Sequence, residues 1–295
     1  MQLRQLPVEA TIDSKRFIKE YLLTQQPVVV RNFIDPFCPA MTKWNIEYLK
    51  EKAGHLQVKL YGKENEFNDH VSSLPVGSCS FSDYLDMITT GPTELRLFLF
   101  NLLQQMPDMK QDIIINDLTD GRIVKWLPYL FFGGAGSSVR YHYDIDMSHV
   151  LLTQLEGEKE VWLFAPEQSV WLYRIPFNFH GLVNLQKPEA QKYPGVKYLS
   201  GLKCTLQKGD TVFIPACYWH YIQYTTGGYS VSHRIFPAGL LNKLAGFSNI
   251  VVTRKFDNIM RSIFKDRWFS YKLALAHKRA NKEIQAISAK RIFSQ

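Results

Sequence analysis

The sequence predicts a mainly β fold, either a sandwich or a small barrel. From about residue 124 to residue 237, hydrophobic residues recur with a period of two in roughly eight short segments. Gly, Pro and Asp residues separate these segments, as they do where one strand turns back on another. Only residues 166–176 interrupt the pattern, with one helical turn followed by a loop. Many short strands without long helices between them are typical of sandwiches and barrels.

Helix and strand signals alternate in the first 123 residues, which we expect to form an α/β elaboration of the β fold. Asp13 or Ser14 can cap the first helix, and Pro27 ends it. The valine-rich residues that follow this proline read as a short strand. Further helices are expected at residues 42–54 and 80–91, with a strand between them, because apolar residues recur at helical spacing and each segment ends in Gly.

From residue 239 onward the hydrophobic period returns to that of a helix, and two or three helices without proline are expected. Between Arg254 and Arg291 this extension contains eleven Lys or Arg and three Asp or Glu. The difference, 11 − 3 = +8, equals the formal net charge of the whole chain. Its basic face can be simply solvated, can form a homodimer interface, or can bind nucleic acid or an acidic partner. Nucleic acid is the least favoured of these because no RNA-binding signature is present.

Composition excludes two classes of protein. The four cysteines are scattered, which argues against a disulfide scaffold and fits a reducing compartment. Residues 1–20 contain no apolar signal-peptide core, and no run of about 18 apolar residues occurs that could span a membrane. We therefore expect a cytoplasmic protein with no membrane partner.

Two histidines and one aspartate form the clearest chemical pattern. His142 and Asp144 are two residues apart in a segment that reads as a strand, so their side chains should point to the same face. His220 is the best candidate for a third ligand from another strand, since Pro215 before it lets the chain change course. Two imidazoles and one carboxylate on one side of a metal suit non-haem Fe(II) oxygenases. The sequence therefore predicts a metal site at these three residues.

The segments around these residues resemble a known family. The pattern "HYD…LTQLEGEKEVWLFAP…GDTVFIPACYWHYIQY" is similar to the JmjC and cupin-like Fe(II)/2-oxoglutarate oxygenases. Within this family the chain looks like the bacterial cupin-like branch, the factor-inhibiting-HIF asparaginyl hydroxylase and the tRNA wybutosine hydroxylase. The resemblance extends to about residue 237. It implies a catalytic domain at residues 1–238, with a double-stranded β-helix (jelly-roll or cupin) barrel core at about 124–237, and a basic helical extension at 239–295.

The resemblance also implies a reaction and its cofactors. The cofactors would be Fe(II) and 2-oxoglutarate, and O2 would be consumed as 2-oxoglutarate is decarboxylated to succinate and a second substrate is hydroxylated. That substrate could be a protein side chain, a tRNA base or a small molecule. His142, Asp144 and His220 would be the iron ligands, and Lys159 would bind the distal carboxylate of 2-oxoglutarate. Arg234, which shares a strand face with Ser232, is the alternative anchor, because other 2-oxoglutarate oxygenases use an arginine on this late strand.

Two positions depart from the family pattern. Several relatives have a threonine where this chain has Val139 and an asparagine where it has Val150, and both residues help to hold the cosubstrate there. The departures leave open a second interpretation, a metal-binding cupin without oxygenase activity that binds or senses a small molecule.

Several further residues are candidates for lining a substrate pocket. Tyr141, His149, Phe100 and Trp219 are the candidates named from their places beside the predicted ligands or on the strand at residues 96–101. For each of them ordinary core packing is the competing interpretation, as it is for Tyr143.

Three neighbouring residues have simpler interpretations. Asp146 is interpreted as a turn residue or a neighbour of the metal ligands, and His233 is expected to face outward. Phe98 is expected only to line the pocket, because phenylalanine lacks the hydroxyl of the pocket tyrosine that relatives place in this region.

Overall fold

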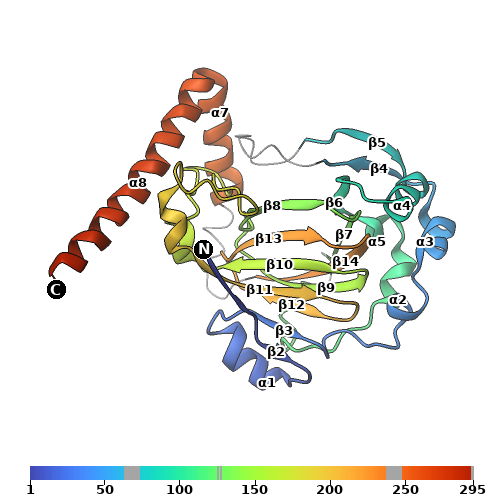
Figure 1. Cartoon of the computed structure of the whole chain (residues 1–295). Helices are drawn as coiled ribbons and strands as arrows, with labels where there is room; N and C mark the ends of the chain where they lie inside the picture. Colours follow the sequence, from blue (N-terminus) through green and yellow to red (C-terminus); the bar gives the residue numbers. More distant parts are fainter. Residues whose placement is uncertain (63–73, 125, 127, 237–247, 294–295) are drawn as a thin grey trace.

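In the computed structural model, two β-sheets face each other and helices lie at both ends of them (Figure 1). The described residues are 1–62, 74–124, 126, 128–236 and 248–293. The five-stranded sheet contains, in spatial order, β1 (Gln2–Gln5), β11 (Ser200–Leu206), β10 (Lys159–Phe164), β13 (Trp219–Tyr224) and β8 (Ser138–His142). The seven-stranded sheet contains β2 (Val8–Glu9), β3 (Val28–Val30), β12 (Thr211–Ile214), β9 (His149–Glu156), β14 (Gly228–Ile235), β7 (Tyr129–Gly133) and β6 (Arg96–Phe100).

The eight strands β7 to β14 are divided between the two sheets in the order of a jelly roll. The neighbours β12, β9, β14 and β7 lie in one sheet, and β11, β10, β13 and β8 lie in the other. Every pairing among these eight strands is antiparallel. The mainly β, jelly-roll prediction is therefore confirmed at the level of strand order.

Most predicted strands are present, but the first one is shorter than its hydrophobic pattern indicates. The alternation begins at Ile123, whereas β7 begins at Tyr129, directly after Pro128. Proline cannot donate a hydrogen bond to a neighbouring strand, so the ladder starts beyond it. Ile123 contributes only an isolated bridge to Ile235.

The N-terminal part forms the predicted α/β elaboration. Its helical segments are α1 (Ser14–Phe17), a π-helical turn (Ile18–Leu22), α2 (Pro39–Thr42), α3 (Ile46–Ala53), α4 (Phe81–Thr90), α5 (Leu102–Gln105) and a 3-10 turn (Pro107–Asp112). A separate hairpin pairs β4 (Gln57–Leu60) with β5 (Gly77–Ser80). The carboxylate of Asp13 caps α1, as predicted, by accepting a hydrogen bond from the backbone N–H of Arg16. The helix predicted at 42–54 begins only at Ile46, because the Asn45 side chain caps it there.

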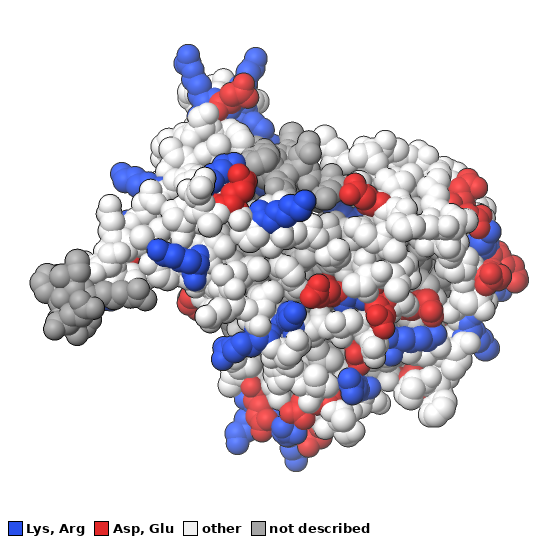
Figure 2. Space-filling view, in the orientation of Figure 1, with Lys and Arg blue, Asp and Glu red and all other residues white. Residues whose placement is uncertain are grey.

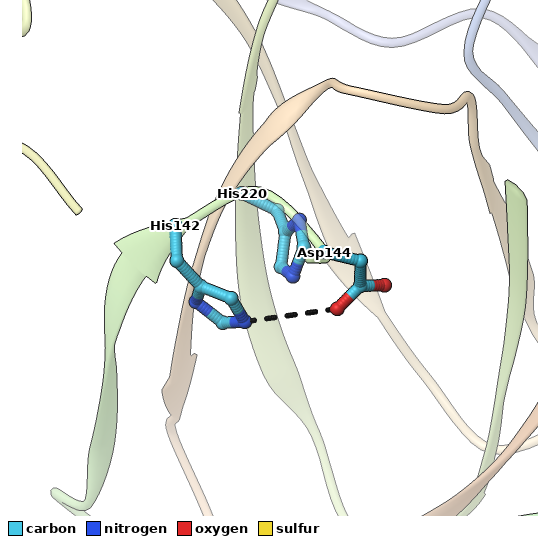
Figure 3. Close-up of side chains that lie close together, drawn as sticks. All are labelled: His142, Asp144 and His220. Carbon is cyan, nitrogen blue, oxygen red and sulfur yellow. Dashed lines mark ion pairs between the residues drawn. The ribbon is translucent and has the colours of Figure 1, made fainter. Parts of the chain in front are cut away.

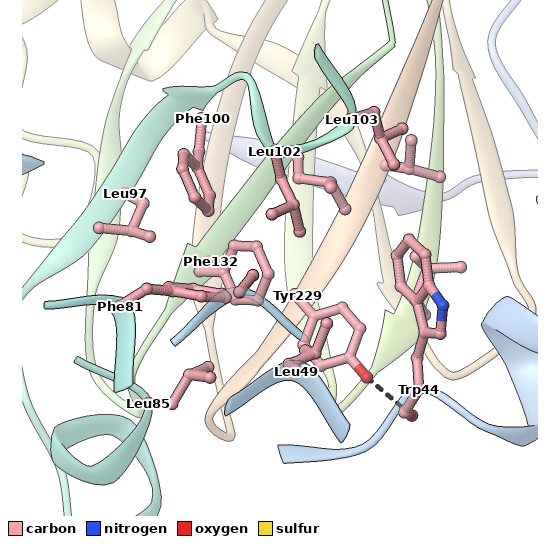
Figure 4. Packing of buried hydrophobic residues seen from close by; sticks show 14 of the residues in the cluster. Trp44, Leu49, Phe81, Leu85, Leu97, Phe100, Leu102, Leu103, Phe132 and Tyr229 are labelled. Carbon is pink, nitrogen blue, oxygen red and sulfur yellow. Dashed lines mark hydrogen bonds between the residues drawn. The ribbon is translucent and has the colours of Figure 1, made fainter. Parts of the chain in front are cut away.

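A large apolar cluster joins this elaboration to the seven-stranded sheet (Figure 4). Phe132 of β7 and Tyr229 of β14 stack with 5.0 Å between ring centroids, and Phe81 of α4 packs edge-on against Phe132. The hydroxyl of Tyr229 donates a hydrogen bond of 2.9 Å to the backbone carbonyl of Trp44. Burial of such large aromatic side chains fixes the helices against the outer face of the sheet.

The described C-terminal residues form a π-helical turn (Asn249–Thr253), α7 (Arg254–Phe264) and α8 (Asp266–Phe293). These helices lie at the opposite end of the sheets from α3 and α4, and the C-terminal part of α8 extends away from the body (Figure 1). The domain boundary predicted at residue 238 lies outside the described residues. Among the helices of the described part of the chain, none is both long enough and apolar enough to cross a membrane.

The segment between β10 and β11 is the platform on which both C-terminal helices pack. It contains two 3-10 turns, Pro166–Val170 and Pro194–Tyr198. Phe177 in this segment lies 5.3 Å from Phe256 of α7 and 5.6 Å from Trp268 of α8, measured between ring centroids. The helices are thereby attached to the same segment that lies beside the cavity described below.

Candidate active site

Strand pairing brings the two predicted histidine ligands together. His142 is the last residue of β8, and its register partner on β13 is His220. Asp144 lies two residues beyond the end of β8, so the prediction that both ligands belong to one strand was wrong for Asp144. The turn that follows lets its carboxylate reach the histidines. One nitrogen or oxygen atom from each of the three residues lies within 4.8 Å of the others (Figure 3).

Backbone carbonyls fix the tautomers of both histidines. Nδ1 of His142 lies 2.8 Å from the carbonyl oxygen of Arg140, and Nδ1 of His220 lies 3.2 Å from that of Tyr218. A carbonyl oxygen only accepts, so Nδ1 must carry the proton in each ring. In the neutral ring Nε2 then carries the lone pair, as a metal-ligating imidazole requires.

Arg234 of β14 holds the far side of the Asp144 carboxylate. Its Nη1 donates to Asp144 Oδ2 at 3.0 Å, to both Asp146 carboxylate oxygens at 3.2 Å and to Ser148 Oγ at 2.5 Å. Asp146 is thus a neighbour of the predicted ligand Asp144, because both carboxylates accept hydrogen bonds from the same guanidinium. Arg234 is engaged with these groups, which favours Lys159 over Arg234 as an anchor for a cosubstrate.

The surroundings keep Asp144 and His220 in the protonation states that bind metal. Burial opposes ionisation of Asp144, but the charge of Arg234 and the two imidazoles outweigh it, so the pKa of the carboxyl falls below its usual range. Burial also lowers the pKa of His220, to about 4. Asp144 is therefore ionised and His220 neutral at physiological pH.

A cavity of about 380 Å³ lies between the two sheets and contains this cluster. Its wall from the five-stranded sheet includes Val139, His142, Lys159, His220, Ile222 and Tyr224. Its wall from the seven-stranded sheet includes Tyr129, Phe131, Val150, Leu152, Ser232 and Arg234. The size is that of an ordinary small-molecule site.

Lys159 is a fully buried cation in this cavity. Its side chain is 1% exposed, and its Nζ donates to Ser230 Oγ at 2.7 Å and lies 4.2 Å from the centre of the Tyr224 ring. Neither partner carries a negative charge. Burial lowers the pKa of Lys159 to about 7. Such a group is unfavourable in the empty protein and becomes favourable when an anion occupies the cavity.

The two departures from the family pattern, Val139 and Val150, both line the same cavity. These two valines give the cavity apolar walls at positions where the family pattern has hydrogen-bonding side chains. Ser232 also lines it, and its hydroxyl lies 3.4 Å from the backbone carbonyl of Tyr129. An anion in the cavity would therefore depend on the charged side chains that line it, Lys159 among them.

Two predicted pocket residues lie on the other face of their strands. Tyr141 and Trp219 are each next to a histidine ligand, so strand alternation turns them away from the cavity. The Tyr141 hydroxyl donates to the backbone carbonyl of Leu172, and Trp219 Nε1 donates to Ser169 Oγ at 2.9 Å. Both are buried in the cluster beneath the β10–β11 segment. The pocket prediction was wrong for them.

His149 and Phe100 are core residues as well. His149 Nδ1 accepts a hydrogen bond of 3.0 Å from the backbone N–H of Ala216, and its ring stacks on Phe213. Phe100 packs against Phe81 and Phe132 instead of lining the cavity. A β-bulge between Leu97 and Phe100 breaks the alternation of β6, so Phe98 lines the cavity, as expected, and Phe100 does not.

His233 faces away from the cavity, as alternation requires, but it is not at the surface. It is 7% exposed, and its ring lies 5.6 Å from the ring of Phe33. The N-terminal elaboration covers this outer face of β14. The prediction that His233 faces outward was therefore wrong about its exposure.

Several cavity residues were not predicted. Leu99 comes from a position where alternation is broken, and Phe179 and His180 come from the β10–β11 segment, where no periodic pattern marks them. Arg254, the first residue of α7, also lines the cavity and is exposed. The composition of the C-terminal extension gave no sign that this part of the chain reaches the site.

The donor set fits a divalent metal such as Fe(II). Two imidazoles, each with Nδ1 hydrogen-bonded to a backbone carbonyl, and one carboxylate converge from one side, which is the ligand pattern of non-haem Fe(II) oxygenases. Lys159 in the same cavity fits an acidic cosubstrate.

Comparison with known proteins agrees with this arrangement. Residues 14–236 match the family described as the Cupin-like domain. The chain belongs to this cupin-like family. The resemblance to JmjC and cupin-like oxygenases that the sequence indicated is thereby confirmed.

The relatives of this cupin-like protein include lysine-specific demethylases and tRNA wybutosine-synthesizing proteins. It is 29% identical over 229 residues to "Lysine-specific demethylase 8" of Danio rerio, with 74% of this chain and 55% of the relative covered. It is 30% identical over 229 residues to "Lysine-specific demethylase JMJ30" of Arabidopsis thaliana, with 73% and 51% covered. It is 22% identical over 290 residues to "tRNA wybutosine-synthesizing protein 5" of Danio rerio, with 88% and 85% covered. The cupin-like protein spans about half the length of the demethylase relatives.

Proposed function

We propose that this protein is an Fe(II)- and 2-oxoglutarate-dependent oxygenase that hydroxylates a C–H bond of a second substrate. The observation that carries the proposal is the position of Lys159, a buried cation without an anionic partner among the described residues, in the same cavity as His142, Asp144 and His220. A 2-oxo diacid has one end that chelates a metal and a second carboxylate that needs a fixed cation in a dry pocket. The cavity offers one group for each end.

The residues divide the work of binding and orientation. His142, Asp144 and His220 would hold Fe(II), which supplies the oxidative chemistry when 2-oxoglutarate and O2 are bound. Lys159 would bind the distal carboxylate, with Ser230 orienting its ammonium group. The apolar side chains of Val139, Val150 and their neighbours exclude water from the cosubstrate and strengthen this ion pair.

Similarity to known proteins does not identify the second substrate. The names of the relatives point to a lysine side chain or to a tRNA base, and the family resemblance also allows a small molecule. The exposed cavity residues Leu99 and Arg254 mark where this substrate would enter.

Binding of 2-oxoglutarate to the Mn(II)-loaded protein tests the proposal, together with succinate formation by the Fe(II)-loaded protein. Wild type should bind 2-oxoglutarate and release succinate slowly even without a second substrate. Lys159→Met should weaken 2-oxoglutarate binding at least about 100-fold, because a buried charged pair loses one partner. Lys208→Met, which removes a lysine paired with Glu156 at the surface, is the matched control and should bind normally.

The second candidate is a cupin that binds metal and a small molecule without oxidising it. The valines at positions 139 and 150 favour it, because they replace hydrogen-bonding groups with apolar walls. Wild-type protein that binds Mn(II) but shows no affinity for 2-oxoglutarate would establish this function and exclude the first.

A further inference from the structure

Arg234 has a different environment from Lys159, the buried lysine of the same cavity. It is 8% exposed, and its Nη1 contacts Asp144, Asp146 and Ser148 together. Ser148 also donates its hydroxyl to Asp146 at 2.9 Å, so the three partners form one connected group. A guanidinium whose Nη1 is shared among three connected side chains in this way has little freedom to move.

The two oxygens of Asp144 are consequently not equivalent. Oδ1 lies 4.0 Å from His142 Nε2, on the side where the ligand atoms converge, whereas Oδ2 receives the hydrogen bond from Arg234 at 3.0 Å. Asp144 lies in a turn beyond the end of β8, so no strand pairing orients its side chain. The guanidinium supplies the orientation that a strand would otherwise provide.

We infer that Arg234 is a positioning residue that keeps Asp144 a one-oxygen ligand. A carboxylate can bind a metal through one oxygen or through both. Occupation of Oδ2 by Arg234 leaves only Oδ1 for the metal, so three coordination positions stay open for a chelating 2-oxo acid and a third ligand. The inference rests on the proposed function for the identity of the metal and the cosubstrate.

Infrared spectroscopy of wild-type protein tests the coordination mode directly. The difference spectrum between Mn(II)-loaded and metal-free protein, with Asp labelled by carbon-13 at its carboxyl, selects the Asp carboxylates that respond to the metal. The band that is absent from the same spectrum of Asp144→Asn is assigned to Asp144. A one-oxygen ligand gives a wide separation between the antisymmetric and symmetric stretches, and a two-oxygen ligand gives a narrow one. We expect the wide separation in wild type, and a narrow separation in wild type would overturn the inference without any Arg234 variant.

Substitution of Arg234 then tests what holds the carboxylate. Arg234→Gln should narrow the separation and change the ligand-field spectrum of the Co(II)-loaded protein, because Oδ2 becomes available to the metal. Arg234→Lys, which keeps one charged donor, should restore most of the wild-type spectrum. Arg261→Gln removes an arginine from another carboxylate, Asp257, and is the matched control that should leave both spectra unchanged.

A structural role alone would give a different pattern. Thermal unfolding of the metal-free variants identifies any that do not fold, and Arg234→Lys together with the wild-type infrared measurement keeps the test informative if Arg234→Gln is one of them. A folded Arg234→Gln protein with wild-type infrared and Co(II) spectra would contradict the inference.

Cosubstrate binding separates this inference from the proposed function. Mn(II)-loaded Arg234→Gln should bind 2-oxoglutarate at least tenfold more weakly than wild type, because a two-oxygen carboxylate takes up a position the 2-oxo acid needs. If wild type itself does not bind 2-oxoglutarate, the proposed function fails, whereas the infrared separation still decides the role of Arg234.

Discussion

At the scale of single residues, Lys159 links stability to function most directly. Burial without an anionic partner lowers its pKa to about 7, so the folded protein binds fewer protons than the unfolded chain between about pH 7 and the ordinary lysine value of 10.5. The contribution of Lys159 to stability therefore becomes less unfavourable as pH rises across this interval, and its destabilising effect is fully present below it. A side chain that costs stability in the empty cavity is typical of a binding residue.

Lys159→Met should accordingly raise the unfolding temperature of the cosubstrate-free protein at pH 7. The difference from wild type should shrink as the pH approaches 10, because wild type then buries a neutral amine. Thermal unfolding at a series of pH values measures this. A variant that is less stable than wild type at pH 7 would mean that the Ser230 and Tyr224 contacts outweigh the burial of the charge.

Alternation along strands explains which site residues could be predicted from the sequence. His142 and His220 were predictable because the HxD pattern and the segment from Gly209 to His220 marked them, although the β8–β13 register shifts between His220 and Ile222. Strand alternation turns their neighbours Tyr141 and Trp219 to the opposite face, so the rule already argued against both as pocket residues. Phe100 could not be placed in this way, because Leu99 adopts a positive φ of 50° inside a β-bulge.

At the scale of elements, the hairpin of α7 and α8 is held by a buried ion pair. Asp257 of α7 and Lys272 of α8 are both 0% exposed, and the lysine Nζ lies 2.7 Å from Asp257 Oδ1. Trp268 Nε1 donates to the same oxygen at 2.8 Å. The pair fixes the angle between the helices and thereby the position of Arg254 at the cavity.

Asp257→Asn should cost about 3–5 kcal/mol of the free energy of unfolding, because it leaves a buried ammonium without its carboxylate. Urea unfolding measures the loss, and hydrogen exchange shows whether it is confined to α7 and α8. The double variant Asp257→Leu with Lys272→Met should recover most of it. A loss below about 1 kcal/mol for the single variant would show that the pair does not hold the hairpin.

The β10–β11 segment shows where prediction from the sequence stops. Its residues follow neither a period of two nor a helical period, since it is shaped by turns and by contacts with α7 and α8. Phe179 and His180 therefore reach the cavity from a region with no local signal. Strands are predictable from neighbouring residues, whereas an irregular segment is specified by distant ones.

At the scale of the whole molecule, one face of the C-terminal hairpin is apolar and exposed. Val252, Phe256, Ile259 and Ile263 are spaced by four, three and four residues and are 59%, 42%, 56% and 62% exposed. This is the spacing of an apolar seam between two helices. Basic and acidic side chains are intermixed over the view in Figure 2, with Lys and Arg projecting where α7 and α8 meet. We propose that a second copy of the chain packs on this seam.

Light scattering during size-exclusion chromatography tests the homodimer. Wild type should have the mass of two chains, and Ile259→Asp with Ile263→Asp should have the mass of one while keeping its circular dichroism spectrum. Lys255→Asp, a charge change of similar size on the same helix but at a polar position, should remain dimeric. Monomeric wild type at micromolar concentration would contradict the proposal.

The central claim is that one cavity binds a metal and a 2-oxo diacid together. A crystal structure of the protein with Mn(II) and N-oxalylglycine, an unreactive analogue of 2-oxoglutarate, tests it most directly. The account predicts a metal bound by His142, Asp144 and His220, with the distal carboxylate of the analogue on Lys159. A distal carboxylate bound by Arg234, or a metal-bound cavity without the analogue, would contradict it.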